Sequence, residues 1–148
     1  MCLILDTNLA SLVFPKGGVP TDADFVPVVD WLYRKDGKLV FGGMNERELM
    51  KVGSAAVAIG ELRRSGRAIQ IPGVDDEQRK VEASGGYVSD DPHILALARK
   101  SGARTLVSHD EDLHRDFKDL RLVPRPRGMI YQDRRHVRML RHTQGCRG

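Results

Sequence analysis

Four acidic residues, far apart in this 148-residue chain, are of a type and placement that could support hydrolytic chemistry. Asp6 ends a short apolar run, and Asp110 follows a second such run after a short gap. Asp91 precedes a predicted helix, and Glu48 lies near the start of another. If the apolar runs are parallel strands, their carboxyl ends share one edge of a sheet, where ligands bind in such folds. We therefore predict that these four acids converge there as catalytic residues.

Carboxylates that converge repel one another, and such clusters are tolerated mainly where divalent cations neutralise them. Oxygen ligands favour Mg²⁺ or Mn²⁺. We expect Asp6, Asp91 and Asp110 to be metal ligands. One or two such ions can generate a nucleophilic water and stabilise the charge that develops on a phosphodiester. Such a site needs no Ser, Cys or His nucleophile.

Each acid also has a simpler structural explanation. A proline at the first helical position makes Asp91 a natural N-cap. Asp110 could cap the helix that follows it, and Asp6 could begin a turn. Glu46 competes with Glu48, because either could be a solvated residue on the surface of the same helix.

The histidines do not show the spacing of metal ligands. They are His93, His109, His114, His136 and His142. We expect structural or surface roles for them. His93, one position after Pro92, is expected to face solvent near the acids.

Strands that alternate with helices indicate an α/β domain, here a three-layer α/β/α sandwich around a mainly parallel sheet. The predicted strands are Cys2–Leu5, Lys38–Phe41, Ala68–Ile71 at an edge, Thr105–Val107 and Met129–Tyr131, with Leu120–Val123 extended. The predicted helices begin at Thr7, at Thr21 (through Arg34), at Asn45 (one long helix through Arg64), within 73–82, at Pro92, at Asp110 and at Arg134 (through His142). Phe25 and Trp31 are expected in the core.

Charge is unevenly distributed along the chain. Residues 121–148 contain eight arginines and one acid, Asp133, whereas residues 1–120 contain 16 basic and 19 acidic residues. We therefore divide the chain into a nuclease-like core, 1–120, and a basic extension, 121–148, that packs on it. In the predicted terminal helix, Val137 and Leu140 lie opposite the basic side. The candidate substrate-binding residues on that side are Arg134, Arg135, Arg138 and Arg141. Such a surface could bind a polyanion such as a nucleic acid, or an acidic protein partner, or it could simply be a solvated end of the chain.

Composition narrows the class of protein. An apolar share of 41% and a charged share of 30% are typical of a globular domain, and no apolar run approaches the length of a membrane span. Two cysteines, Cys2 and Cys146, provide no disulfide framework and no zinc-ligand spacing. These features predict a cytoplasmic protein with reduced thiols.

Three stretches of the chain together resemble the PIN-domain ribonuclease family. They are LILDTN, an acid near residue 48, and DDPHILALARKSGARTLVSHDEDL, and the resemblance covers about residues 2–117. It implies an α/β/α sandwich, Mg²⁺- or Mn²⁺-dependent endoribonuclease activity and often a role as the toxin of a toxin–antitoxin pair. By position, the family's acidic quartet corresponds to Asp6, Glu48, Asp91 and Asp110. The resemblance also implies that Asp112 is an accessory acid and metal ligand, and that Asn8 and Ser108 are polar residues that support the cluster. The chain departs from the family in two respects: its glutamate lies inside a helix, and its basic tail extends beyond the usual core.

Other functions could also explain these acids. A haloacid-dehalogenase-like phosphatase needs a second aspartate two positions after the first, where this chain has Asn8. The strongest alternative is a non-catalytic module that binds RNA or a protein and carries a vestigial acid cluster. Within the nuclease interpretation, a toxin with an antitoxin partner and an RNA-processing enzyme are both open, as is a homodimer.

Overall fold

The sheet at the centre of the fold is five-stranded and entirely parallel. The computed structural model describes residues 2–141 and 146. The strand order is β3-β2-β1-β4-β5. The strands are β1 (Cys2–Leu5), β2 (Lys38–Phe41), β3 (Ala68–Gln70), β4 (Thr105–Val107) and β5 (Met129–Tyr131). The carboxyl ends of β1 and β4 are level, because Leu5 pairs with Val107.

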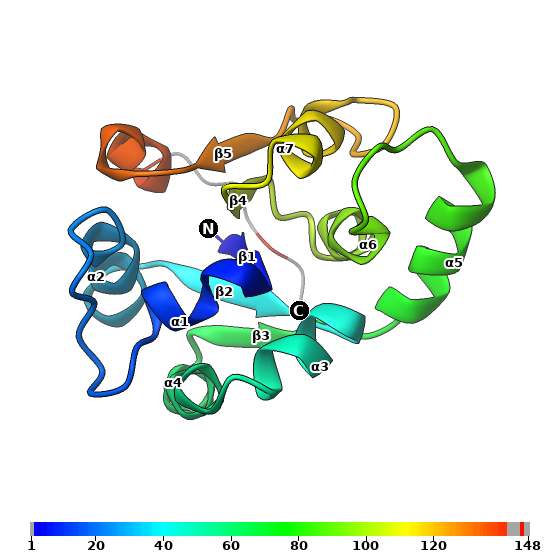
Figure 1. The fold of residues 1–148 in the computed structure, drawn as a ribbon. Helices are drawn as coiled ribbons and strands as arrows, with labels where there is room; N and C mark the ends of the chain where they lie inside the picture. Colours follow the sequence, from blue (N-terminus) through cyan, green and yellow to red (C-terminus); the bar gives the residue numbers. More distant parts are fainter. Residues whose placement is uncertain (1, 142–145, 147–148) are drawn as a thin grey trace.

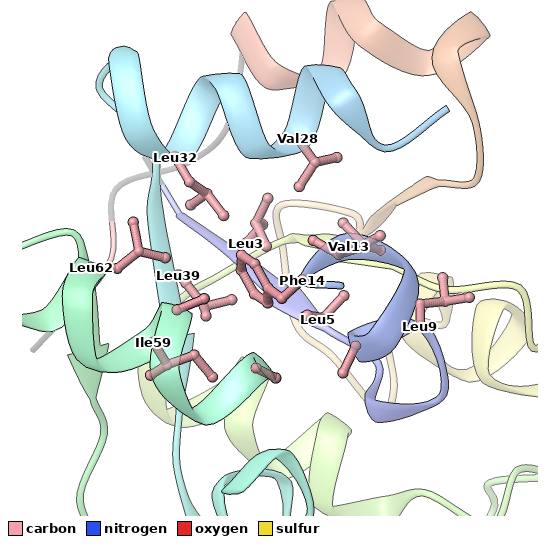
Figure 2. Packing of buried hydrophobic residues seen from close by; sticks show 14 of the residues in the cluster. Leu3, Leu5, Leu9, Val13, Phe14, Val28, Leu32, Leu39, Ile59 and Leu62 are labelled. Carbon is pink, nitrogen blue, oxygen red and sulfur yellow. The ribbon is translucent and has the colours of Figure 1, made fainter. Parts of the chain in front are cut away.

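Side chains of the strands alternate between two buried clusters, as the period of two in a strand requires. Leu3 and Leu5 enter one cluster, and Cys2 and Ile4 enter the other. Figure 2 shows the first cluster, in which β1 and β2 leucines pack beneath helices. Phe25 and Trp31 are buried in the same cluster, as predicted.

Helices cover both faces of the sheet and form a three-layer α/β/α sandwich, as predicted (Figure 1). The first face is covered by η1 (Thr7–Leu9), α1 (Ala10–Val13), α2 (Val26–Arg34), α4 (Gly53–Arg64) and the 3₁₀ helix η2 (Arg134–Arg141). The second face is covered by α5 (Val74–Ser84), α6 (Pro92–Ser101) and α7 (Glu111–Lys118). Helix α3 (Gly43–Met50) contacts α4, α5 and α6 and thus bridges the two layers.

The prediction of one helix from Asn45 to Arg64 is wrong. The chain forms α3 and α4 with a break at Val52, whose backbone is extended (φ −92°, ψ 100°). Gly53 follows directly, and glycine is unfavourable inside a helix. The break lets Leu49 of α3 and Ile59 of α4 reach the same cluster from different directions.

Two smaller predictions also differ from the structure. The second helix begins at Val26 and not at Thr21, because the Asp22 side chain accepts a hydrogen bond from the Asp24 N–H in a local turn. Residues 120–123 form a turn in which the Leu122 and Val123 N–H groups donate to the Asp119 carbonyl, and they are not an extended segment.

The basic segment after residue 120 takes part in the central sheet and in the first cluster. Met129–Tyr131 forms β5 at the sheet edge, and Leu140 of η2 is buried against the first face. Val137, predicted on the apolar side with Leu140, is instead 41% exposed. The predicted terminal residue of this helix, His142, lies outside the described residues. Within 2–141 and 146, none of the helices combines the length and apolarity that a membrane span requires.

Candidate active site

Asp6 and Ser108 lie side by side where two neighbouring strands end. The parallel pairing continues one residue beyond β1, because the Asp6 N–H donates to the Val107 carbonyl (3.0 Å). Ser108 Oγ donates to Asp6 Oδ2 (2.8 Å), and the Asn8 N–H donates to Asp6 Oδ1 (3.2 Å). Asp6 is 5% exposed and Ser108 is fully buried. Asn8 therefore supports Asp6 through its backbone, while its exposed side chain makes no hydrogen bond to the described residues.

Asp110 combines helix capping with a place beside Ser108. Its Oδ1 accepts from the N–H groups of Asp112 and Leu113 at the start of α7 (3.0 and 3.2 Å). Its own N–H donates to Ser108 Oγ (3.0 Å), so one serine connects Asp6 to Asp110. The other carboxylate oxygen, Asp110 Oδ2, has no hydrogen bond to the described part of the chain. Asp112 is exposed in the first turn of α7 and is not among the charges that act on Asp91.

The pKa of Asp91 is affected by its burial and by the charges of the other acids. Burial raises the pKa of Asp91 to about 6, with further contributions from the negative charges of Asp6, Asp110 and Glu48, in that order, and a smaller one from Asp90. No basic side chain is among these influences. Although Asp91 occupies the N-cap position of α6, its carboxylate makes no capping hydrogen bond. The Asp91 carboxylate is therefore not used up by capping, the role that its sequence position suggested.

Glu48 and Glu46 of α3 face different neighbours. Glu46 accepts two hydrogen bonds from Gln70 Nε2 at the end of β3 (2.7 and 2.9 Å) and is not among the charges acting on Asp91. Glu48 acts on Asp91, and its Oε1 lies 3.6 Å from His93 Nε2. Of the two glutamates, Glu48 is thus the one that belongs to the group of acids.

The expectation that His93 faces solvent is wrong. The side chain is 3% exposed, because it points from α6 toward Glu48 on α3. Burial lowers the pKa of His93, although the nearby Glu48 and Asp6 charges oppose this shift. Its Nδ1 has no hydrogen-bond partner among the described residues. His93 is therefore a neutral, buried neighbour of the acids.

Three further residues hold the site, and the sequence interpretation gave none of them this role. Asn45 Nδ2 donates to the Leu5 carbonyl (3.0 Å) and fixes α3 to the end of β1. Asp116 accepts from the N–H groups of Val88 and Ser89, just before Asp91. His114 Nε2 lies 2.7 Å from the Ser108 carbonyl, to which it donates.

A periodicity signal for two of these residues was present in the sequence. Leu113 and Phe117 are four positions apart in α7, and all of Leu113, His114, Asp116 and Phe117 are buried on one side of that helix. A polar residue on an apolar helical face needs a partner inside the protein. The same rule applies to Asn45, which is buried in α3 four positions before the buried Leu49.

The four candidate substrate-binding arginines of η2 are not brought into the acid group. The helix packs against α2 and β5. Arg135 pairs with Asp133 (2.7 Å), and the hydrogen bonds from Arg135 hold the pKa of Asp133 below its ordinary value. Arg134, Arg138 and Arg141 are exposed.

The chemistry of this donor set fits a hard divalent cation. Its members are carboxylates from separate elements that repel one another, with no basic side chain among the influences on Asp91. Among residues 2–141 and 146, however, no three Asp, Glu, His or Cys side chains are already arranged as a set of metal ligands. The acids are therefore close enough to interact but are not drawn together into a closed coordination shell.

Comparisons of the chain with known proteins leave the family open. No protein-family model, no curated protein and no solved structure matches it. The resemblance to PIN-domain ribonucleases stays a prediction from the sequence.

Proposed function

We propose that the protein is an endoribonuclease that depends on Mg²⁺ or Mn²⁺ and hydrolyses RNA phosphodiesters. One observation carries the proposal. Acids from the ends of β1 and β4 and from α3 and α6 interact at one edge of the sheet, with no basic side chain among the influences on Asp91. A structural ion-pair network would include basic side chains beside the carboxylates. A group of uncompensated carboxylates is instead suited to metal-assisted hydrolysis.

Each residue of the group has a role in this proposal. Asp6, Asp91 and Asp110 would hold the cation, which supplies an activated water and stabilises the charge on the phosphodiester when it is bound. Ser108 and the Asn8 N–H fix the orientation of the Asp6 carboxylate. Glu48, beside the neutral His93, is the fourth acid. Asp112 is exposed and remains a candidate outer ligand.

The experiment compares cleavage of a mixed-sequence, single-stranded RNA by the wild-type protein and by single variants. With Mn²⁺ present, wild type should cut the RNA, and EDTA should abolish cutting. Asp6→Asn and Asp110→Asn should each reduce the rate at least about 100-fold, because each removes a charge from the metal site. Asp90→Asn makes the same chemical change at an exposed neighbour and should keep most of the activity.

Two results would overturn the proposal. Cutting that persists in folded Asp6→Asn and Asp110→Asn would assign the activity to another site or to a contaminant. A folded wild-type protein that binds Mn²⁺ but cuts no RNA would favour the alternative of a non-catalytic RNA- or protein-binding module. Circular dichroism spectra of each variant test whether the fold persists.

We further propose a cytoplasmic toxin whose partner is an antitoxin protein. An apolar cavity of about 730 Å³ lies away from the acids, between the loop at 14–20, α2 and α4. Val19 and Val57, which line it, are 74% and 64% exposed. A protein partner that covers this surface would remove these side chains from water. Growth arrest on expression, relieved by the product of an adjacent small gene, tests this role, and unarrested growth would favour an RNA-processing enzyme.

A further inference from the structure

A second, polar cavity of about 520 Å³ lies beside α7. Its basic lining residues are Arg115 and Lys118, one turn apart on α7, and Arg127 from the segment before β5. Side chains three positions apart in a helix lie on the same face. All three basic side chains are exposed, and none forms an ion pair with a carboxylate of the described residues.

The charge of this cavity is not balanced by its acids. Asp119, one of the two acids in the lining, is already paired with Arg121 (2.8 Å). Glu111, in the first turn of α7, is the other. The cavity therefore contains three basic side chains and one carboxylate, that of Glu111, that form no ion pairs with the described residues. Such an excess attracts anions.

A glycine explains why Arg127 lies so close to α7. A Cβ atom at Gly128 would lie 2.4 Å from both the ring and the carbonyl oxygen of Phe117 in α7. Only a residue without a side chain lets the segment approach the helix so closely. The segment at 124–128 is thereby pressed against α7, and Arg127 joins the cations of the helix.

The cavity is connected to the acids through one buried side chain. His114 lines the cavity, and its Nε2 donates to the carbonyl of Ser108 (2.7 Å). Ser108 in turn hydrogen-bonds Asp6 and the Asp110 N–H. Gln132, the first residue after β5, lines the end of the cavity nearest the acids, and Arg127, before β5, lines the other end.

We propose that this cavity binds a phosphate group of the RNA strand, next to the phosphodiester that is cut. The inference rests on the proposed function and adds a substrate subsite to it. Phosphates repeat along a strand, so a strand seated over the acids must place further phosphates nearby. Exposed arginines and a lysine without carboxylate partners are the groups that hold phosphates in protein–RNA contacts. The acids would hold the cation beside the reacting phosphate, and the cavity would hold a neighbouring phosphate.

The test measures binding without cleavage. A fluorescein-labelled, 12-nucleotide single-stranded RNA is titrated with the full chain in EDTA at several salt concentrations. Lys118→Ala/Arg127→Ala should weaken binding about tenfold. It should also make the slope of log binding constant against log salt concentration shallower by about 0.7, the value for one lost phosphate contact on a single strand. Lys38→Ala/Arg64→Ala removes the same charge from exposed positions in β2 and α4, on the other side of β1 from β4 and β5, and should leave both quantities near wild type.

Equal affinity and salt dependence in the two double variants would overturn the proposal. A poly-glutamate peptide serves as a second probe: if the cavity variant loses peptide binding but keeps RNA binding, the cavity belongs to an acidic protein partner. Failure of the nuclease proposal looks different. A wild type that binds RNA through the cavity but cuts nothing with Mn²⁺ would retain the subsite and refute the catalytic role.

Discussion

Two glutamates of α3 provide a matched pair for testing the fourth acid of the group. Glu48→Gln should reduce RNA cleavage at least about tenfold, because its charge acts on Asp91 at the site. Glu46→Gln should keep activity, since Glu46 is occupied by Gln70 on β3. Initial cleavage rates with Mn²⁺ measure both effects. The reverse result, with Glu46→Gln inactive and Glu48→Gln active, would show that the wrong glutamate has been assigned.

The burial of Asp91, together with repulsion from the other acids, also predicts a dependence of stability on pH in the metal-free protein. The pKa of Asp91 is about 6 in the folded protein and 3.8 ordinarily, so the folded state binds more protons between these values. Stability should therefore fall as the pH rises from about 4 to about 6 and then stay level. Asp91→Asn, which cannot ionise, should exceed wild type in unfolding free energy at pH 7.5 by about 1–3 kcal/mol.

Urea unfolding in EDTA at pH 4 and at pH 7.5 measures this effect. Most of the advantage of Asp91→Asn should disappear at the lower pH, where the wild-type carboxyl is protonated in the folded state and about half protonated in the unfolded state. The exposed Asp90→Asn serves as a control and should change stability little at either pH. An advantage of equal size at both pH values would show that ionisation of Asp91 is not its cause.

At the scale of elements, one buried carboxylate fixes the segment that delivers Asp91. Asp116 of α7 is 2% exposed, and it accepts hydrogen bonds from Val88 (2.9 and 3.2 Å) and Ser89 (2.8 Å). Asp116→Asn halves the carboxylate acceptors and introduces an amide donor. We expect a loss of about 1–3 kcal/mol in unfolding free energy. We also expect slower RNA cleavage, because Asp91 follows this segment.

A second acid of the same region controls for the loss of charge. Asp119→Asn changes only exposed contacts with Arg121, whose backbone N–H and guanidinium donate to Asp119, and should change stability and activity little. Urea unfolding and RNA cleavage are measured for both variants. If Asp116→Asn resembles Asp119→Asn in both measurements, the bonds to Val88 and Ser89 do not hold the site together.

Elements whose signal is local could be predicted from the sequence, whereas polar residues buried by tertiary contacts could not. Cys2–Leu5 and Thr105–Val107 are short, continuous apolar runs, and both are central strands. The break at Val52 was missed because apolar residues continue at helical spacing across it. His93 was misplaced because its burial depends on α3, which is distant in the sequence. The sequence patterns therefore predicted the strands that carry acids at their ends. They did not predict the buried polar residues that surround those acids.

At the scale of the whole molecule, two cysteines widely separated in the sequence come together. Cys146 packs against the second buried cluster, which contains Cys2 of β1. The Cys2 thiol donates a hydrogen bond to Cys146, which lowers the pKa of Cys146 and raises that of Cys2. The positive charge of Lys38, at the start of β2, adds to the lowering at Cys146. The sequence suggested two unrelated thiols, since nothing local to either residue indicates the contact.

This contact predicts that the two thiols differ in reactivity and that one controls the other. Iodoacetamide at pH 7.5 should modify the partly exposed Cys146 several-fold faster than the buried Cys2, because the thiolate is the reactive form. Cys2→Ala removes the hydrogen-bond donor and should shift the pH midpoint of Cys146 alkylation upward, whereas Cys2→Ser, which keeps a donor, should shift it less. Mass spectrometry of each modified cysteine over a pH series measures these rates. An identical Cys146 midpoint in wild type, Cys2→Ala and Cys2→Ser would mean that the two residues do not meet in solution.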